Sequence, residues 1–187
     1  MTDDRRFSRI VSLACHDLRT PLATVYGFAR TLERGGGLDE RSLRFATMIS
    51  EASQQMTALL DELGVAARIE GGRFEAGLVE ADTVALATSS DERVVTSGRG
   101  ETIETEAVAL ARGLESLAIA AVRFGPVEQV TWTVDGRSLS LAPVVEAAAP
   151  VVLGEEIRDL GSLVARSVIE QLGGSLVLEG ETLLVQL

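Results

Sequence analysis

The sequence predicts an α+β protein: an N-terminal helical hairpin that forms a dimeric four-helix bundle, followed by a small α/β sandwich. Three observations support this prediction. Apolar residues keep a heptad spacing through two segments that glycines separate. A hairpin signal stands at Asp135-Gly136, and helical and strand patterns alternate around it. The chain has 187 residues, of which 46% are hydrophobic, enough for one domain or two small ones.

The first seventy residues predict two long helices. Glycines at 35–37 end the first helix, because each glycine costs about 1 kcal/mol inside a helix. The second helix begins near Asp39, a predicted N-cap, and ends near Glu70. In both helices, apolar or small residues alternate in steps of four and three: Phe7, Val11, Ala14, Leu18, Pro21, Val25, Phe28 and Leu32, then Phe45, Ile49, Ala52, Met56, Leu59 and Leu63. We call these residues the heptad seam.

Two such helices bury only part of their apolar surface by packing on each other. A second copy of the hairpin would supply the missing helices, so we expect a homodimer through residues 7–63. The alternative is a monomer whose hairpin packs only on the C-terminal half of the chain.

The remainder predicts the α/β sandwich, and we place the boundary between domains 1–72 and 73–187. Helices are expected at 104–124 and 159–172. Strands are expected at 129–134, around Leu139 and Leu141, at 175–178 and at 182–187. The segment 78–86 is ambiguous between helix and strand.

Composition excludes several kinds of chemistry. All 17 cationic residues are arginine, against 28 acidic residues, and the net charge of −11 disfavours nucleic acid and anionic membranes as partners. The single cysteine, Cys15, and single histidine, His16, make neither an internal disulfide nor a usual zinc site. No signal peptide and no apolar run of about 18 residues is present, so we expect a cytoplasmic protein without a membrane segment.

The residues around His16 combine groups that suit nucleophilic chemistry. His16 lies off the heptad seam and should face solvent, with Asp17 beside it and Thr20 one turn further on the same face. Imidazole is a nucleophile near neutral pH, and a neighbouring carboxylate can orient the ring. Pro21 removes the helix hydrogen bond to the Asp17 carbonyl. The alternative is that His16 is an ordinary surface histidine without a chemical role.

The string His-Asp-Leu-Arg-Thr-Pro-Leu at 16–22 resembles the H-box of the dimerisation and phosphoacceptor domain of sensor histidine kinases. The resemblance implies that His16 is phosphorylated, that Asp17 stands where a general base acts, and that Thr20 stands where a residue assists phosphatase activity. Arg19 and Pro21 complete the box. Residues 59–63 and 68–75 resemble the end of that domain and its link to an ATP-binding domain.

The second half resembles the ATP-binding domain of these kinases, with departures. The helix at 110–124 is similar to the one that carries a magnesium-binding Asn, but Ala120 occupies that position. The family's adenine-binding Asp is missing, since no Asp lies between Arg137 and Gly154. Residues 159–166 resemble a glycine box in which Asp159 replaces a glycine and Gly161 remains. Only residues 143–158 are left for the nucleotide lid.

These resemblances together predict a two-component signalling protein that exchanges a phosphoryl group between His16 and the receiver aspartate of a response regulator. Neither ATP nor a metal is expected as a cofactor. One alternative is an active histidine kinase with an atypical ATP site, which would need ATP and Mg²⁺. Another is a non-catalytic pseudokinase that binds signalling partners.

Overall fold

The structure is a computed structural model that describes residues 3–187, with side chains from Arg6 onward. Residues 1 and 2 of the expected first domain lie outside the described residues. The chain divides into two compact units, one up to Arg73 and one from Phe74.

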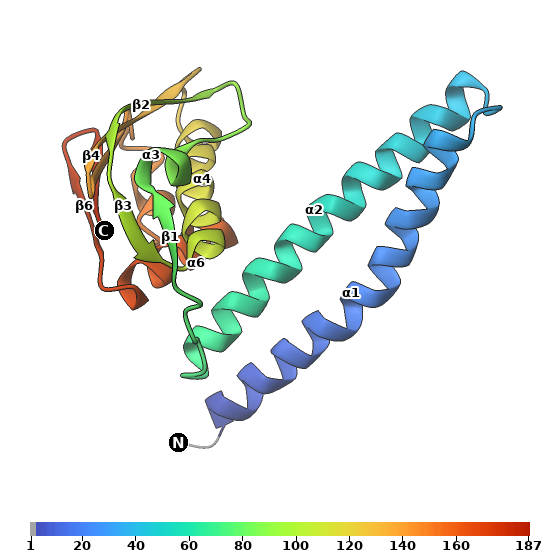
Figure 1. Cartoon of the computed structure of the whole chain (residues 1–187), viewed down its shortest axis with the longest axis horizontal. Helices are drawn as coiled ribbons and strands as arrows, with labels where there is room; N and C mark the ends of the chain where they lie inside the picture. The colour runs from blue at the N-terminus through green and yellow to red at the C-terminus, as the bar shows by residue number, and fades with distance from the viewer. Residues whose placement is uncertain (1–2) are drawn as a thin grey trace. The chain divides into compact units, whose positions relative to one another are not determined.

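The first unit is a helical hairpin of α1 (Asp3–Gly35) and α2 (Glu40–Glu70), which run antiparallel (Figure 1). As predicted, Asp39 caps α2: its Oδ1 accepts a hydrogen bond from the Ser42 backbone N–H at 2.7 Å. Backbone and side-chain hydrogen bonds from Ser42 also lower the pKa of Asp39. The helix α1 continues through Pro21 without a break.

The contact between α1 and α2 is made by small residues, not by the heptad seam. The buried residues of the hairpin are Ser8, Cys15 and Ala29 on α1 and Ala46, Ser50, Ser53, Gly64 and Ala67 on α2. Nearly all of them follow a seam residue by one position, a rotation of about 100° around the helix. Since the helices are antiparallel, both seams lie on the same side of the hairpin. That side is open in a single chain: Phe28 is 68% exposed and Leu59 is 53% exposed.

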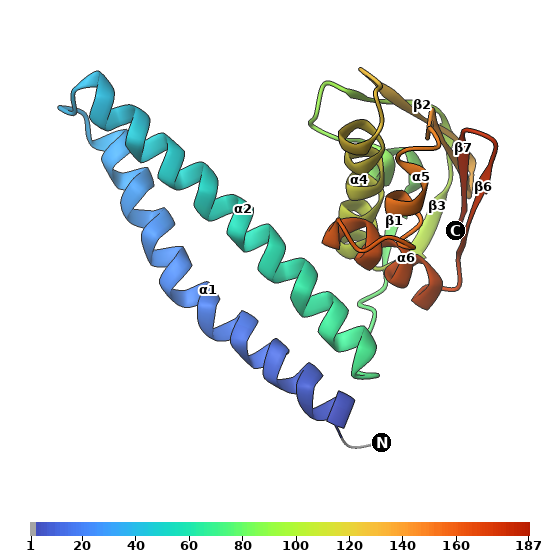
Figure 2. The ribbon, with the colours of Figure 1, turned by 180° about the vertical axis from the view of Figure 1, so that it is seen from behind.

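The second unit is a two-layer α/β sandwich, as predicted. Its five-stranded sheet has the order β2-β4-β5-β7-β6, in which β2 and β4 are parallel and the other pairs are antiparallel. Helices cover one face of this sheet (Figure 2). The strands are β2 (Val94–Gly100), β4 (Val130–Gly136), β5 (Ser138–Ala142), β6 (Ser175–Glu179) and β7 (Thr182–Gln186). The helices are α3 (Thr83–Ala87), α4 (Ala107–Phe124), α5 (Ala149–Val152) and α6 (Leu160–Gln171).

The structure corrects the sequence prediction before α4. The helix expected at 104–124 begins only at Ala107, because Glu106 caps it through the Ala109 N–H. The preceding residues form β3 (Thr102–Thr105), which pairs with β1 (Val79–Asp82) in a separate two-stranded sheet. The strand β2 was not predicted. The hairpin at Asp135-Gly136 is confirmed, with Gly136 at φ +61°.

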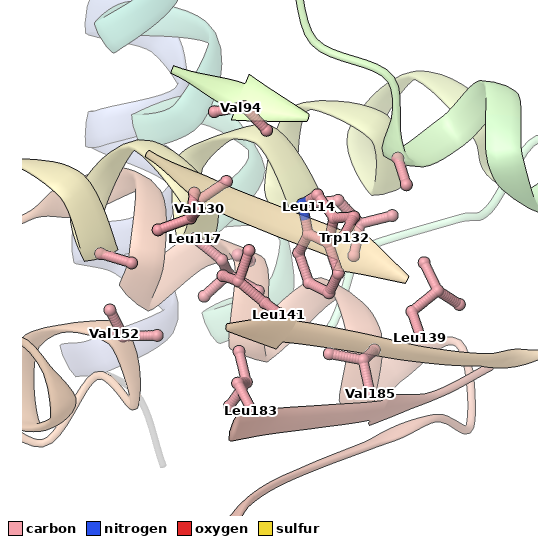
Figure 3. Close-up of a cluster of buried hydrophobic side chains, with 14 of the residues drawn as sticks. Val94, Leu114, Leu117, Val130, Trp132, Leu139, Leu141, Val152, Leu183 and Val185 are labelled. Atoms are coloured by element: carbon pink, nitrogen blue, oxygen red, sulfur yellow. The ribbon is translucent and has the colours of Figure 1, made fainter. Parts of the chain in front are cut away.

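The core of the second unit lies between α4 and the sheet. Trp132 on β4 belongs to one buried cluster with Leu114 and Leu117 of α4, Leu141 of β5 and Leu183 of β7 (Figure 3). All five side chains are 0% exposed. This core makes the second unit a stable scaffold for α4 and α6, on which the ATP-site positions of the sequence analysis lie.

Candidate functional site

His16 and Asp17 form an exposed pair on α1. Nδ1 of the imidazole lies 3.2 Å from Oδ1 of Asp17, and the two side chains are 76% and 67% exposed. An ionised carboxylate only accepts hydrogen bonds, so this contact favours the tautomer with the proton on Nδ1. The other ring nitrogen, Nε2, is then left unprotonated, with its lone pair available to an incoming electrophile.

Thr20 and Pro21 lie in the next turn of α1, and both are exposed. Pro21 has no N–H, so the Asp17 carbonyl loses its usual helix partner. The Thr20 carbonyl accepts a hydrogen bond from Thr24 Oγ1 at 3.1 Å, a side-chain bond of the kind that bends helices. The structure therefore places Thr20 one turn from His16, in a part of α1 that has a weakened hydrogen-bond ladder.

Arg19 points toward the other helix of the hairpin. Its Nε and Nη2 donate to Oδ1 of Asp61 on α2, at 3.0 and 2.8 Å. The side chains of Arg19 and Asp61 are 39% and 22% exposed. Cys15, one turn earlier, is buried against Gly64 of α2. The H-box string thus has one side bound to α2 and one side, with His16, Asp17 and Thr20, in solvent.

The ATP-site positions lie where α4 packs directly on α6. A methyl group added at Gly161 would come within 2.6 Å of Ser116 Oγ, and one at Gly113 within 3.2 Å of the Ala165 Cα. Ala120 lies one turn beyond Ser116 on the same side of α4 and is 0% exposed. The two helices therefore approach so closely that little room is left between them at this point.

Asp159 does not extend into open space. Its Oδ1 accepts hydrogen bonds from the backbone N–H and the hydroxyl of Ser162, at 2.9 and 3.2 Å, and so caps α6. Its Oδ2 lies 3.7 Å from Nη1 of Arg123. A carboxylate thus already stands at the end of α6, where the exposed N–H groups and the helix dipole favour an anion.

The segment between β5 and α6 turns inward. Four of its residues are 0% exposed, namely Val144, Ala148, Val151 and Val152, and three of these belong to the main core.

No group of three or more His, Cys, Asp or Glu side chains suited to a metal is found within the described part of the chain. In the same residues, no helix is both long and apolar enough to cross a membrane.

Comparison with known families identifies the hairpin. Residues 8–72 match the His Kinase A (phospho-acceptor) domain. These residues belong to that domain family. The phosphoacceptor domain therefore includes the exposed His16–Asp17 pair, the Arg19–Asp61 contact and both heptad seams.

Two relatives of this chain carry the names of sensor proteins. The chain is 31% identical over 87 residues to "Probable sensor histidine kinase TcrY" of Mycobacterium tuberculosis. The matched residues make up 46% of this chain and 18% of TcrY. It is 28% identical over 103 residues to "Sensor protein DivL" of Caulobacter vibrioides, covering 52% of this chain and 13% of DivL. The chain thus spans less than a fifth of the length of these two relatives.

Solved structures share the fold of both units. Full-length ShkA, in complex with AMPPNP, superposes with a TM-score of 0.64 at 20% identity, over 95% of this chain and 44% of ShkA. The Acinetobacter baumannii histidine kinase AdeS superposes with a TM-score of 0.53 at 16% identity, over 91% of this chain and 94% of AdeS. The phosphoacceptor hairpin is thus followed by an α/β domain with the fold found in histidine kinases.

Two residues of the site were not singled out in the sequence. Asp61 lies in the segment 59–63 that resembles the end of the phosphoacceptor domain, but the resemblance assigned it no role. The turn near residue 40 makes residues that are equally distant from it in sequence lie opposite each other. Arg19 therefore faces Asp61, just as Tyr26 faces Gln54. Ser116 is visible only through its contact with Gly161.

Proposed function

We propose that this protein carries a phosphoryl group on His16 and exchanges it with the receiver aspartate of a response regulator. The observation that carries this proposal is the exposed His16–Asp17 pair within a phosphoacceptor domain. A histidine that is three-quarters exposed on a helix is accessible to the active site of another protein. The similarity to a probable sensor histidine kinase supports a role in two-component signalling.

The transfer is a substitution at phosphorus. Nε2 of His16 attacks the phosphorus of the receiver's aspartyl phosphate, and the P–N bond forms as the bond from phosphorus to the aspartate oxygen breaks. The receiver carboxylate leaves with the electron pair of that bond. The ring becomes cationic, and the Asp17 carboxylate, at 3.2 Å from Nδ1, stabilises it or accepts its proton. Thr20, four residues after His16 on the same face of α1, would orient a water molecule that attacks the phosphorus of the receiver's aspartyl phosphate, releasing phosphate and the free carboxylate.

The exposed heptad seams support a homodimer through residues 7–63. Large apolar side chains on one side of a hairpin are costly in water, and a second hairpin would cover them in a four-helix bundle. Two copies of residues 1–72 would then present two His16 side chains outward, away from the shared seam.

We infer that the α/β domain, residues 73–187, acts without ATP. The buried methyl group of Ala120 offers Mg²⁺ no oxygen ligand, and the Asp159 carboxylate at the end of α6 repels phosphate. The close Gly161–Ser116 contact leaves little room beside it. These residues do not fit a magnesium-bound nucleotide. In this proposal the domain is a docking or structural module, and the protein needs no cofactor.

One observation favours a different function, that of an active histidine kinase. Full-length ShkA, whose fold the chain shares, is in complex with the nucleotide analogue AMPPNP. Calorimetry with ATP and Mg²⁺ separates the two proposals. We expect no heat of binding up to millimolar ATP, whereas micromolar binding with labelling of His16 would establish the kinase.

The phosphotransfer itself is tested with radiolabelled receiver domains. Receivers phosphorylated on aspartate are mixed with the protein, and the chain is examined for label that acid removes and base does not. We expect this label on the wild type and none on His16→Ala. If no receiver of the organism labels the chain, or if label persists in His16→Ala, the proposal is wrong. A non-catalytic binding role would then remain.

A further inference from the structure

The contact between Arg19 and Asp61 lies beside the phosphoacceptor but has no role in the chemistry above. Both donors of Arg19 converge on a single oxygen of Asp61, and both side chains are partly buried between the helices. A charge-assisted contact of this kind is short and directional, so it fixes one helix against the other. Arg19 lies three residues after His16, which is the spacing of neighbours on a helix surface.

The position of His16 depends on this part of α1 more than on its own contacts. Among the described residues, the imidazole bonds to Asp17, its neighbour in sequence, and to nothing on α2. A contact within one turn of α1 does not fix that turn relative to α2. The residues that pack between α1 and α2 at this point are small, with Cys15 against Gly64. Because Pro21 removes a backbone hydrogen bond, the turn from 17 to 21 is held less firmly than the rest of α1.

We propose that Asp61 is a positioning residue for the phosphoacceptor: through Arg19 it fixes the turn of α1 that Pro21 loosens, and so sets where His16 meets the receiver. This inference rests on the proposed function. Transfer between two proteins requires the reacting atoms to be closely aligned, and a displacement of about 1 Å can cost ~100-fold in rate. The chemistry of the imidazole itself is unchanged when Asp61 is altered.

The test uses the full chain with Asp61→Asn, which keeps the size of the side chain and removes its charge. We expect kcat for transfer from a phosphorylated receiver to fall about tenfold or more, with KM little changed. His16 is the single histidine, so its reaction with diethyl pyrocarbonate reports intrinsic reactivity alone. That rate should stay within about twofold of the wild type. Asp61→Glu, which retains a carboxylate, should recover most of the transfer rate.

A matched control removes a charge pair from the same hairpin. Glu40 pairs with Arg44 at the far end of α2, so Glu40→Gln should leave both rates unchanged. An unaltered transfer rate in Asp61→Asn overturns the inference. So does a loss of transfer in both Asp61 variants that follows a loss of helical circular dichroism, because Asp61 would then only stabilise the hairpin.

A second readout is independent of phosphotransfer. The ring C–H signals of His16 form one set in the NMR spectrum, and we expect Asp61→Asn to shift them while Glu40→Gln does not. If the wild type accepts no phosphoryl group but these signals shift, the proposed function fails and the positioning by Asp61 stands. Signals that coincide in wild type and Asp61→Asn overturn the positioning, whatever the transfer assay shows.

Discussion

The Asp159 carboxylate accepts the backbone N–H of Ser162 at 2.9 Å and stands at the N-terminus of α6. From the sequence, Asp159 was noted only as the residue that replaces a glycine in the segment 159–166. In the structure the same carboxylate also satisfies the first turn of the helix and lies near Arg123. One carboxylate thus stabilises the α/β domain and fills a position suited to an anion.

We expect Asp159→Ala to lower the free energy of unfolding of the α/β domain by about 1 kcal/mol, the usual value of an N-cap. Asp159→Asn should cost much less, because an amide oxygen also caps a helix. Urea unfolding followed by the fluorescence of Trp132, the single tryptophan, measures both. Neither variant should bind ATP, since Ala120 and the Gly161–Ser116 contact remain. ATP binding by Asp159→Ala would show that the carboxylate alone closes the site.

Charged substitutions in the heptad seam should separate the proposed dimer. Phe28 and Leu59 are exposed in one chain, and burying such a side chain in a dimer contributes about 1.5–3 kcal/mol. We expect Leu59→Glu and Phe28→Glu to raise the dimer dissociation constant by tenfold or more, measured by size exclusion with light scattering. Leu43, 41% exposed and off the seam, gives the control Leu43→Glu. A wild-type chain that is monomeric at micromolar concentration would contradict the prediction.

The sequence predicted those parts of the fold that depend on local pattern. The cap at Asp39, the turn at Gly136 and the end of α2 near Glu70 follow from residue types whose preferences hold in any context. The strand β2 was missed because its residues 97–100, Ser-Gly-Arg-Gly, have low strand propensity. It is a strand because β4 pairs with it along its whole length.

The candidate site also has a part that the sequence predicts and a part that it does not. His16, Asp17 and Thr20 are neighbours on one helix, so sequence spacing alone places them together. Asp61 is 42 residues from Arg19, and only the register of the hairpin brings them into contact. The orientation of the heptad seam also required the structure, since periodicity shows that a helix has an apolar side but not which neighbour covers it.

Cys15 should behave as a packing residue. Its side chain is 2% exposed and its Cβ lies 4.0 Å from where a methyl group on Gly64 would be. We expect slow reaction with Ellman's reagent in the folded protein and fast reaction in urea. Cys15→Leu should destabilise the hairpin by about 1–3 kcal/mol through overpacking, whereas Cys15→Ala should cost less. Fast labelling of the native thiol would show that α1 and α2 separate readily at this turn.

Trp132 should be unusually tolerant of replacement by phenylalanine. The indole is 0% exposed, and its Nε1 has no hydrogen-bond partner among the described residues. A buried donor without a partner costs about 1–3 kcal/mol, and Phe removes that donor. The lost volume acts in the opposite direction, so we expect Trp132→Phe to destabilise the domain less than Leu117→Ala, for which core truncation costs about 2–5 kcal/mol. Urea unfolding followed by circular dichroism compares the two. Equal losses would mean that Nε1 has a partner in solution, such as a buried water molecule.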